Sequence, residues 1–126
     1  MKLEGELTQR LVKAIRKGLP NSVVFKHSDR VTYGIPDVSV TWLGSTTWLE
    51  MKRIAVSGAA IQHARMCQLA TQGRAFYVVF QEVGSEVRTP EGKAVFRAAT
   101  DDDVVRFLRM THAKHRNSSF SQANAG

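Results

Sequence analysis

The 126-residue sequence contains one cysteine, Cys67, and no long run of apolar residues. A single cysteine excludes a disulfide framework, and it also excludes a metal site built from several thiolates. A membrane-spanning helix needs about 18 or more consecutive apolar residues, and the N-terminus also lacks the apolar stretch of a signal peptide. We therefore expect an intracellular protein in a reducing compartment, with no membrane partner.

Acidic residues are scarce as well, since 11 Asp and Glu stand against 18 Lys and Arg and leave a formal net charge of +7. Such a surface favours polyanionic partners such as nucleic acid, although the same charge also provides simple solubility. The length suits a single domain with one core. We predict one domain over residues 1–115 and a tail, 116–126, whose Ser-, Asn- and Gln-rich composition is typical of disorder.

Hydrophobic periodicity predicts an alternation of helices and short strands. Apolar residues recur every four positions at the start of the chain, and polar and apolar residues alternate after Pro36. The stretch from Arg74 to Val83 is a nearly continuous apolar run, which is typical of a strand buried on both faces. We predict helices over 3–18, 57–72 and 102–114, and strands over 22–26, 37–42, 46–53, 74–83, 86–88 and 93–98.

Two acidic residues and a lysine on successive predicted strands stand out. Asp37 follows a Gly-Ile-Pro turn, and Glu50 lies two residues before Lys52. Side chains alternate along a strand, so Glu50 and Lys52 share one face with Trp48. A hairpin turning through residues 43–46 would bring Asp37 beside Glu50, because neighbouring strands lie about 4.8 Å apart. The sequence therefore predicts that two carboxylates and an ammonium converge.

An exposed strand face with solvated charges is the alternative for this motif. Leu49 and Met51 flank the glutamate, and the apolar strand near residues 74–83 would lie beside it. This context indicates a central strand, where burial of unpaired charges is costly unless they have a function. We therefore favour a functional site.

The predicted order helix–strand–strand–strand–helix–strand resembles the PD-(D/E)xK nuclease superfamily, above all its VRR-NUC and Holliday-junction-resolvase-like branches. The motifs that carry this resemblance are Gly34-x-Pro36-Asp37, Glu50-x-Lys52 and Gln62 in the following helix. The resemblance covers about residues 4–83. It implies an α/β fold with a restriction-endonuclease-like core, in which a central mixed β-sheet is flanked by helices in the order αβββαβ.

The resemblance also implies a role for each motif residue. Asp37 and Glu50 match the metal-binding carboxylates, Lys52 matches the motif lysine, and Gln62 matches the helix glutamine that lies beside it. Such residues fit phosphodiester hydrolysis, because a hard cation held by oxygens activates water and offsets charge on phosphorus. We expect Mg²⁺ or Mn²⁺, with the backbone carbonyl of Met51 as a further ligand. Lys52 would orient the water, deprotonate it or stabilise the developing charge.

The first helix offers one more carboxylate. Glu4 resembles the N-terminal glutamate that completes the site in resolvase-like members, and on a helical projection it falls within the leucine stripe. Glu6 points away from that stripe and stays open as the alternative. Both glutamates also suit a helix N-terminus for purely electrostatic reasons.

Four basic residues are candidates for phosphate contacts near this site: Lys26, Arg30, Arg53 and Arg65. Each of them alone could be a solvated surface charge. The sequence thus predicts a metal-dependent DNA endonuclease, small enough to fit a phage-encoded enzyme. A nucleic-acid-binding module without turnover, an exonuclease and an assembly protein are the alternatives. The resolvase resemblance also allows a two-fold dimer, because a four-stranded junction requires two active sites.

Two other clusters contain possible metal ligands, but we favour a structural explanation for each. The run from Asp101 to Asp103 has the pattern of a helix cap and first turn. His112 and His115, three residues apart, have a spacing that zinc sites use, but a solvated basic helix end explains them as well.

Overall fold

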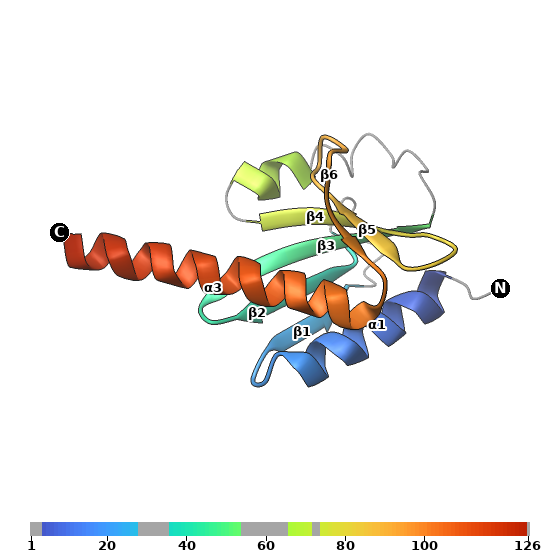
Figure 1. Cartoon of the computed structure of the whole chain (residues 1–126), viewed down its shortest axis with the longest axis horizontal. Coiled ribbons are helices and arrows are strands. Elements are labelled where there is room, and N and C mark those ends of the chain that lie inside the picture. Colours follow the sequence, from blue (N-terminus) through green and yellow to red (C-terminus); the bar gives the residue numbers. More distant parts are fainter. Residues whose placement is uncertain (1–3, 28–35, 54–65, 72–73, 126) are drawn as a thin grey trace.

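A computed structural model describes residues 4–27, 36–53, 66–71 and 74–125, and the side chains of these residues except residues 4 and 115–125. The chain forms one six-stranded sheet with helices on both faces (Figure 1). The elements, in chain order, are α1 (Glu4–Gly18), β1 (Val23–Lys26), β2 (Val38–Trp42), β3 (Ser45–Arg53), β4 (Arg74–Phe80), β5 (Ser85–Arg88), β6 (Ala94–Ala98) and α3 (Asp101–Ala125).

The strands lie in the sheet in their chain order, from β1 to β6. All neighbours are antiparallel except β3 and β4, which are parallel and therefore need a crossover connection. This mixed sheet flanked by helices confirms the predicted α/β fold class. Of the helix predicted over 57–72, residues 66–71 are helical, and the rest lies outside the described residues. In the described part of the chain, no helix is both long and apolar enough to span a membrane.

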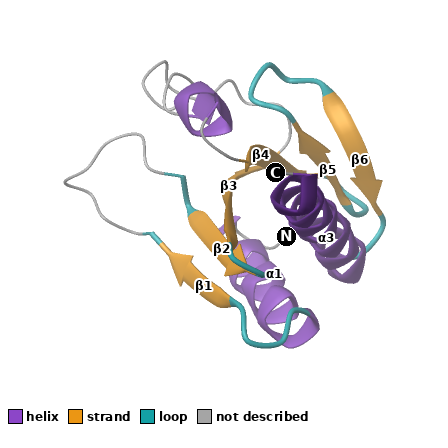
Figure 2. Cartoon of the chain, turned by 90° about the vertical axis from the view of Figure 1, so that its left-hand side faces the viewer, coloured by secondary structure: helices purple, strands orange, loops and turns teal. Residues whose placement is uncertain are grey.

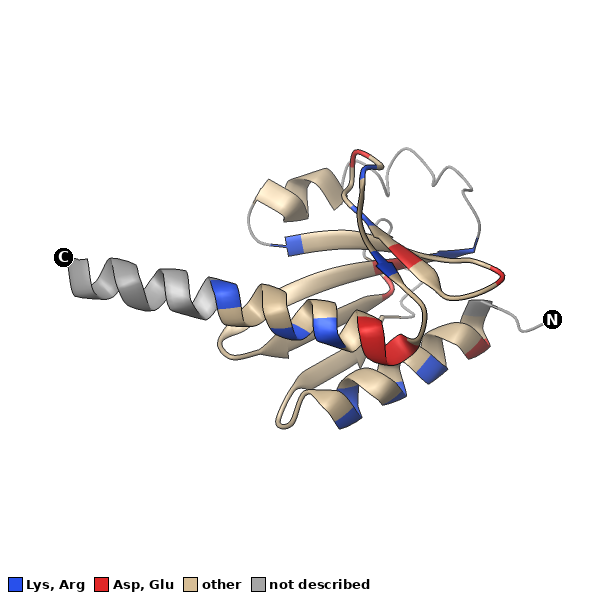
Figure 3. Cartoon of the chain, viewed as in Figure 1, with Lys and Arg blue, Asp and Glu red and all other residues tan. Residues whose placement is uncertain are grey.

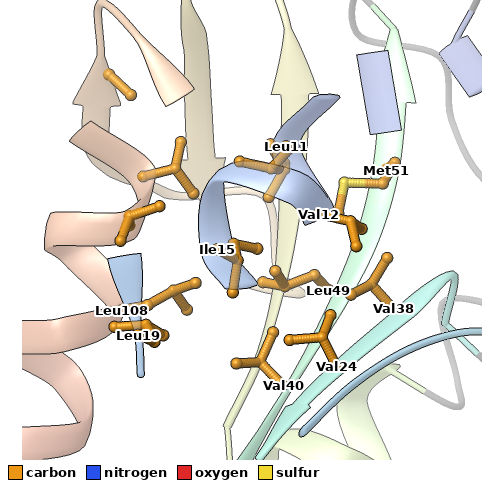
Figure 4. Packing of buried hydrophobic residues seen from close by; sticks show 14 of the residues in the cluster. Leu11, Val12, Ile15, Leu19, Val24, Val38, Val40, Leu49, Met51 and Leu108 are labelled. Carbon is orange, nitrogen blue, oxygen red and sulfur yellow. The ribbon is translucent and has the colours of Figure 1, made fainter. Parts of the chain in front are cut away.

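The sheet curves around α1 and α3, and the helical segment 66–71 lies on its other face (Figure 2). Leu11, Val12 and Ile15 of α1 point toward Leu49 and Met51 of β3 (Figure 4), and all five are buried. Each such side chain contributes about 1.5–3 kcal/mol when it leaves water. Because side chains alternate along a strand, the burial of Leu49 and Met51 on this face turns their neighbours in β3 to the opposite face.

Several element ends differ from the sequence prediction. β4 stops at Phe80, where the predicted strand ran to Val83, because the Gln81 N–H donates to the Gly84 carbonyl at 3.0 Å and closes the turn into β5. α3 begins at Asp101, and the Asp103 carboxylate accepts the N–H groups of Ala99 and Thr100 at 3.0 and 3.2 Å. The predicted first turn is therefore confirmed for the acidic run, whereas the residue that precedes the helix is Thr100 rather than an aspartate.

The other end of α3 also differs from the prediction. The helix continues to Ala125, past the expected end near Lys114 and through nearly all of the predicted tail, 116–126. Composition pointed to disorder because the tail offers few apolar residues for a core. Helix extension follows different physics, since each residue added to an existing helix gains one hydrogen bond and needs no new nucleus.

His112 lies in the interior, and the prediction of a solvated helix end is wrong for this residue. Its ring is fully buried, with Nδ1 2.9 Å from the Trp42 carbonyl oxygen and Nε2 2.8 Å from the Thr47 hydroxyl. A carbonyl oxygen only accepts, so Nδ1 carries the proton and Nε2 accepts from Thr47. The histidine thereby ties α3 to the β2–β3 hairpin. Its spacing, four residues after the buried Leu108, was the sequence signal for an inward position.

Gly44 and Gly84 provide a matched pair for testing the turn into β5. Both have left-handed backbone angles, with φ of 78° and 76°. A Cβ at position 44 meets open space, whereas a Cβ at position 84 clashes with the Ala98 carbonyl oxygen. We predict that Gly44→Ala lowers the free energy of unfolding by about 1–2 kcal/mol of backbone strain. Gly84→Ala should lose roughly 1–3 kcal/mol more through overpacking. Urea denaturation measures both, and equal losses would contradict the proposed clash.

Candidate functional site

The β2–β3 hairpin brings the two acidic motif residues together. Val38 pairs with Leu49, so the same register continued by one residue sets Asp37 opposite Glu50. Leu43 and Gly44 form the two-residue turn, with φ of 52° and 78°, as a turn that follows the strand twist requires. Pro36 immediately precedes the pair, at a place where no ladder bond needs its missing N–H.

Hydrogen bonds join the two acidic residues crosswise. The Asp37 N–H donates to Glu50 Oε1 at 3.2 Å, and the Met51 N–H donates to Asp37 Oδ2 at 2.9 Å. Each carboxylate is therefore held by the backbone of the opposite strand. These hydrogen bonds fix both carboxylates near the start of β2, on the face of the sheet that points away from α1.

Glu50 is the most constrained charge in this arrangement. It has no exposed surface, and its Oε2 is buried without a hydrogen-bond partner in the described structure. Burial, followed by hydrogen bonding to Asp37 and the charge of Asp37, raises the pKa of Glu50 from 4.5 to about 9. Lys52 and the Asp37 N–H lower this pKa but do not cancel the increase. An orphaned buried oxygen of this kind calls for a further partner, for which water or a cation qualifies.

The donor set around Glu50 fits a hard divalent cation. Asp37 and Glu50 offer carboxylate oxygens, and the Met51 carbonyl points to the side on which its N–H meets Asp37, because both groups of a strand residue face one neighbour. Mg²⁺ is usually held by one or two protein carboxylates and keeps several waters. Within the described residues, no group of three His, Cys, Asp or Glu side chains surrounds a common point. The fit therefore rests on two carboxylates and a carbonyl.

Lys52 lies on the same face of β3 as Glu50, two residues further on, and its charge acts on the Glu50 carboxyl. The first turn of α1, which contains Glu4, lies at the end of the sheet where the last residues of β3 are found (Figure 1). The Glu4 side chain is outside the described structure, and Glu6 is exposed. Gln62 also falls outside the described residues.

The structure describes the positions of two of the four basic residues that were expected to contact phosphate. Lys26 is exposed at the end of β1. Arg53 follows Leu49 and Met51 in the alternation of β3, so it belongs to the α1 face and lines a cavity of about 740 Å³ together with Arg10. The structure therefore does not place Arg53 beside Glu50. Arg30 and Arg65 lie outside the described residues.

Two neighbours of the carboxylate pair were not predicted from the sequence. His27 donates its backbone N–H to the Asp37 carbonyl at 2.7 Å, and its Nε2 lies 2.8 Å from Ser39 Oγ. Tyr77 of β4 pairs with Glu50, and burial and then the Glu50 charge raise the pKa of its hydroxyl. His27 falls just after the predicted strand 22–26, and the register of a parallel strand after a long connection leaves no signal in the sequence.

The same face of the sheet continues to β6, because Glu86 pairs with Val79 and with Arg97. The Glu86 carboxylate accepts from Arg88 Nε at 2.7 Å and from Arg97 Nη2 at 3.1 Å. These hydrogen bonds hold the pKa of Glu86 below its usual value. The ion cluster joins the last two strands without contributing a partnerless oxygen.

The pairing and order of the elements give a mixed six-stranded sheet flanked by helices, which agrees with the predicted resemblance at the level of the fold. Among solved structures, the chain is similar to Hjc of Archaeoglobus fulgidus, a Holliday junction resolvase from an archaeal hyperthermophile. The TM-score is 0.55 at 10% sequence identity, and the match covers 82% of this chain and 88% of that chain. No protein-family model and no curated protein sequence matches the chain.

The raised pKa of Glu50 predicts how stability depends on pH in the metal-free protein. Below pH 4.5 both the folded and the unfolded chain carry the proton, whereas between pH 4.5 and about 9 only the folded chain keeps it. The free energy of unfolding should therefore fall as pH rises, by about 1.4 kcal/mol per pH unit from this group.

Glu50→Gln should remove this dependence and be more stable than the unmodified protein at pH 8. Urea unfolding with a chelator at pH 5, 6.5 and 8 measures the effect. The exposed Glu82→Gln variant is the control and should keep the original slope. An unchanged slope in Glu50→Gln would rule out the buried, protonated carboxyl.

Proposed function

We propose that the protein is a metal-dependent DNA endonuclease that hydrolyses phosphodiester bonds. The observation that carries the proposal is the crosswise Asp37–Glu50 pair, with one fully buried glutamate oxygen that lacks a partner. Similarity to the fold of a Holliday junction resolvase supports it. We further propose selectivity for branched DNA, such as junctions or flaps, in recombination, repair or phage DNA processing.

Asp37, Glu50 and the Met51 carbonyl would hold Mg²⁺ or Mn²⁺. The bound cation would supply an activated water and would offset the charge that develops on the phosphate. Lys52 shares the face of Glu50, so its ammonium is placed to orient that water or to stabilise the same charge. The buried setting of Glu50 lowers the local dielectric and strengthens each of these interactions. Glu4 and Gln62 complete this proposed site.

The basic surface supplies the affinity for DNA in this proposal. Figure 3 shows Lys and Arg along α1 and along α3 after its acidic first turn. The exposed residues of α1 include Arg10, Lys13, Arg16 and Lys17. Neutralising phosphates with such side chains releases counterions, so binding should weaken steeply as salt increases.

Single substitutions test the catalytic assignment. We predict that Asp37→Ala and Lys52→Ala each lower the rate of Mg²⁺-dependent cleavage by about 10²-fold or more, as expected when one group that stabilises the transition state is lost. The assay compares supercoiled, linear, flapped and four-way-junction DNA. The exposed Asp102→Ala and Lys93→Ala variants are the charge-matched controls and should retain activity. Equal cleavage by all four variants would identify a contaminating nuclease and contradict the proposal.

Metal binding can be tested without turnover. Titration calorimetry with Mn²⁺ should show one site in the unmodified protein and in Lys52→Ala, because the lysine is not a ligand. Asp37→Ala should bind at least about tenfold more weakly, a loss of 1.4 kcal/mol. Equal affinity in Asp37→Ala would remove this carboxylate from the ligand set.

A nucleic-acid-binding module that keeps the nuclease fold without turnover is the second candidate. The pKa of about 9 for Glu50 favours it, because a proton on this carboxyl competes with a cation at neutral pH. It predicts salt-sensitive DNA binding without cleavage in any divalent metal. An exonuclease is a variant of the first proposal, and cleavage of circular DNA distinguishes it, since a circle offers no end. A two-fold dimer would supply the second active site that a four-stranded junction needs.

A further inference from the structure

Aromatic side chains from β1, from His27 just after it and from β3 form a row beside the carboxylate pair, with Ser39 of β2 between them. Phe25 pairs with Ser39, and Ser39 pairs with Trp48, so all three lie on one face of the sheet. His27, two residues after Phe25, lies on this face as well. The row belongs to the face opposite α1, which is also the face of Glu50.

Ring contacts and one hydrogen bond hold the row in order. The His27 ring lies 6.3 Å from the Phe25 ring and 5.4 Å from the Trp48 ring, measured between centroids. The bond from Ser39 Oγ to His27 Nε2, 2.8 Å long, fixes the imidazole between them. Because partners on both sides restrain this ring, the three aromatic groups form a preorganised surface.

Phe25 leaves more than half of its side chain uncovered by the protein. It is 59% exposed on the edge strand, whereas its neighbour Val24, which points to the core, is buried. Aromatic rings that remain in water beside a polar site mark a surface that binds something. Lys26 is exposed next to Phe25 and adds a positive charge at this edge.

The row lies within a short distance of the candidate cation site. The His27 N–H bonds the Asp37 carbonyl, and Asp37 in turn contacts Glu50. Phe25 and Trp48 are each two residues along their strands from His27 and Glu50, which corresponds to about 7 Å. A nucleotide on the row would therefore be next to a phosphate at the carboxylates.

We propose that Phe25, His27 and Trp48 stack unpaired bases of the DNA strand whose phosphate enters the carboxylate site. Stacked duplex bases hide their faces, whereas unpaired bases offer them to aromatic rings on an open sheet. The substrate class is then DNA with single-stranded nucleotides at the cut, such as flaps and splayed arms. This inference deepens the proposed nuclease function and depends on it for the cleavage step.

Binding is tested first, in a chelator so that no strand is cut. Oligothymidylate should quench the tryptophan fluorescence, and Trp48→Phe should abolish the quenching while keeping a stacking ring. Phe25→Leu keeps an apolar side chain but loses the ring, so the dissociation constant should rise about tenfold, or 1.4 kcal/mol. Phe25→Tyr should restore binding. Val23→Ala, which shortens an exposed aliphatic side chain on the same strand face, is the control and should bind as the unmodified protein does.

Cleavage and oligomeric state separate the possible outcomes. Phe25→Leu should lower the rate of metal-dependent flap cleavage, whereas the control Val23→Ala should retain it. If no DNA is cut but Phe25→Leu still loses oligothymidylate, the nuclease proposal fails and base stacking stands. Unchanged affinity in Phe25→Leu overturns base stacking even if the enzyme is active. The same holds if light scattering shows that Phe25→Leu only converts a dimer into a monomer, which would make this face an interface between copies.

Discussion

The candidate site depends on the hydrogen bonds that tie Asp37 to β3. Because the Met51 N–H donates to the Asp37 carboxylate and the Asp37 N–H donates to Glu50, neither acid can leave the hairpin independently. The same stretch of β3 packs Leu49 and Met51 against α1, so the core and the candidate site lie on opposite faces of one strand. The hydrophobic core thereby sets the direction in which the two acids point.

Two buried polar groups in this small domain illustrate different uses of burial. His112 Nδ1 donates to the Trp42 carbonyl and Nε2 accepts from the Thr47 hydroxyl, so both ring nitrogens are satisfied and the ring joins α3 to the hairpin. Glu50 is equally buried but keeps an oxygen without a partner and a strongly raised pKa. A satisfied buried network rigidifies a fold, whereas an unsatisfied buried group needs a further partner such as water or an ion.

Much of the fold and the centre of the site could be predicted because the relevant signals are local. Strand alternation and a hairpin turning through residues 43–46 were enough to place Asp37 beside Glu50 and to give Lys52 its face. Tyr77 could not be found in this way, because a parallel neighbour's register depends on how the crossover packs rather than on nearby residues. Arg53 was predicted to lie near the site because it directly follows Lys52 in the sequence. Side chains alternate along β3, so Arg53 points to the α1 face, opposite to that of Lys52. His112 was misread because polarity was weighed above its position on the apolar side of α3.

The turn at Leu43 and Gly44 determines both how locally the site forms during folding and which register the two strands adopt. The acids and the lysine lie within one hairpin, whose contacts are local and whose formation takes about 1–10 μs, whereas pairing β3 with β4 must close a much longer loop. The site geometry therefore forms within one local unit, although a lone hairpin is only marginally stable without α1. Changing the turn by one residue would shift the register and send Glu50 into the core in place of Leu49. The length of this distant turn is therefore as much a requirement of the site as the acids themselves.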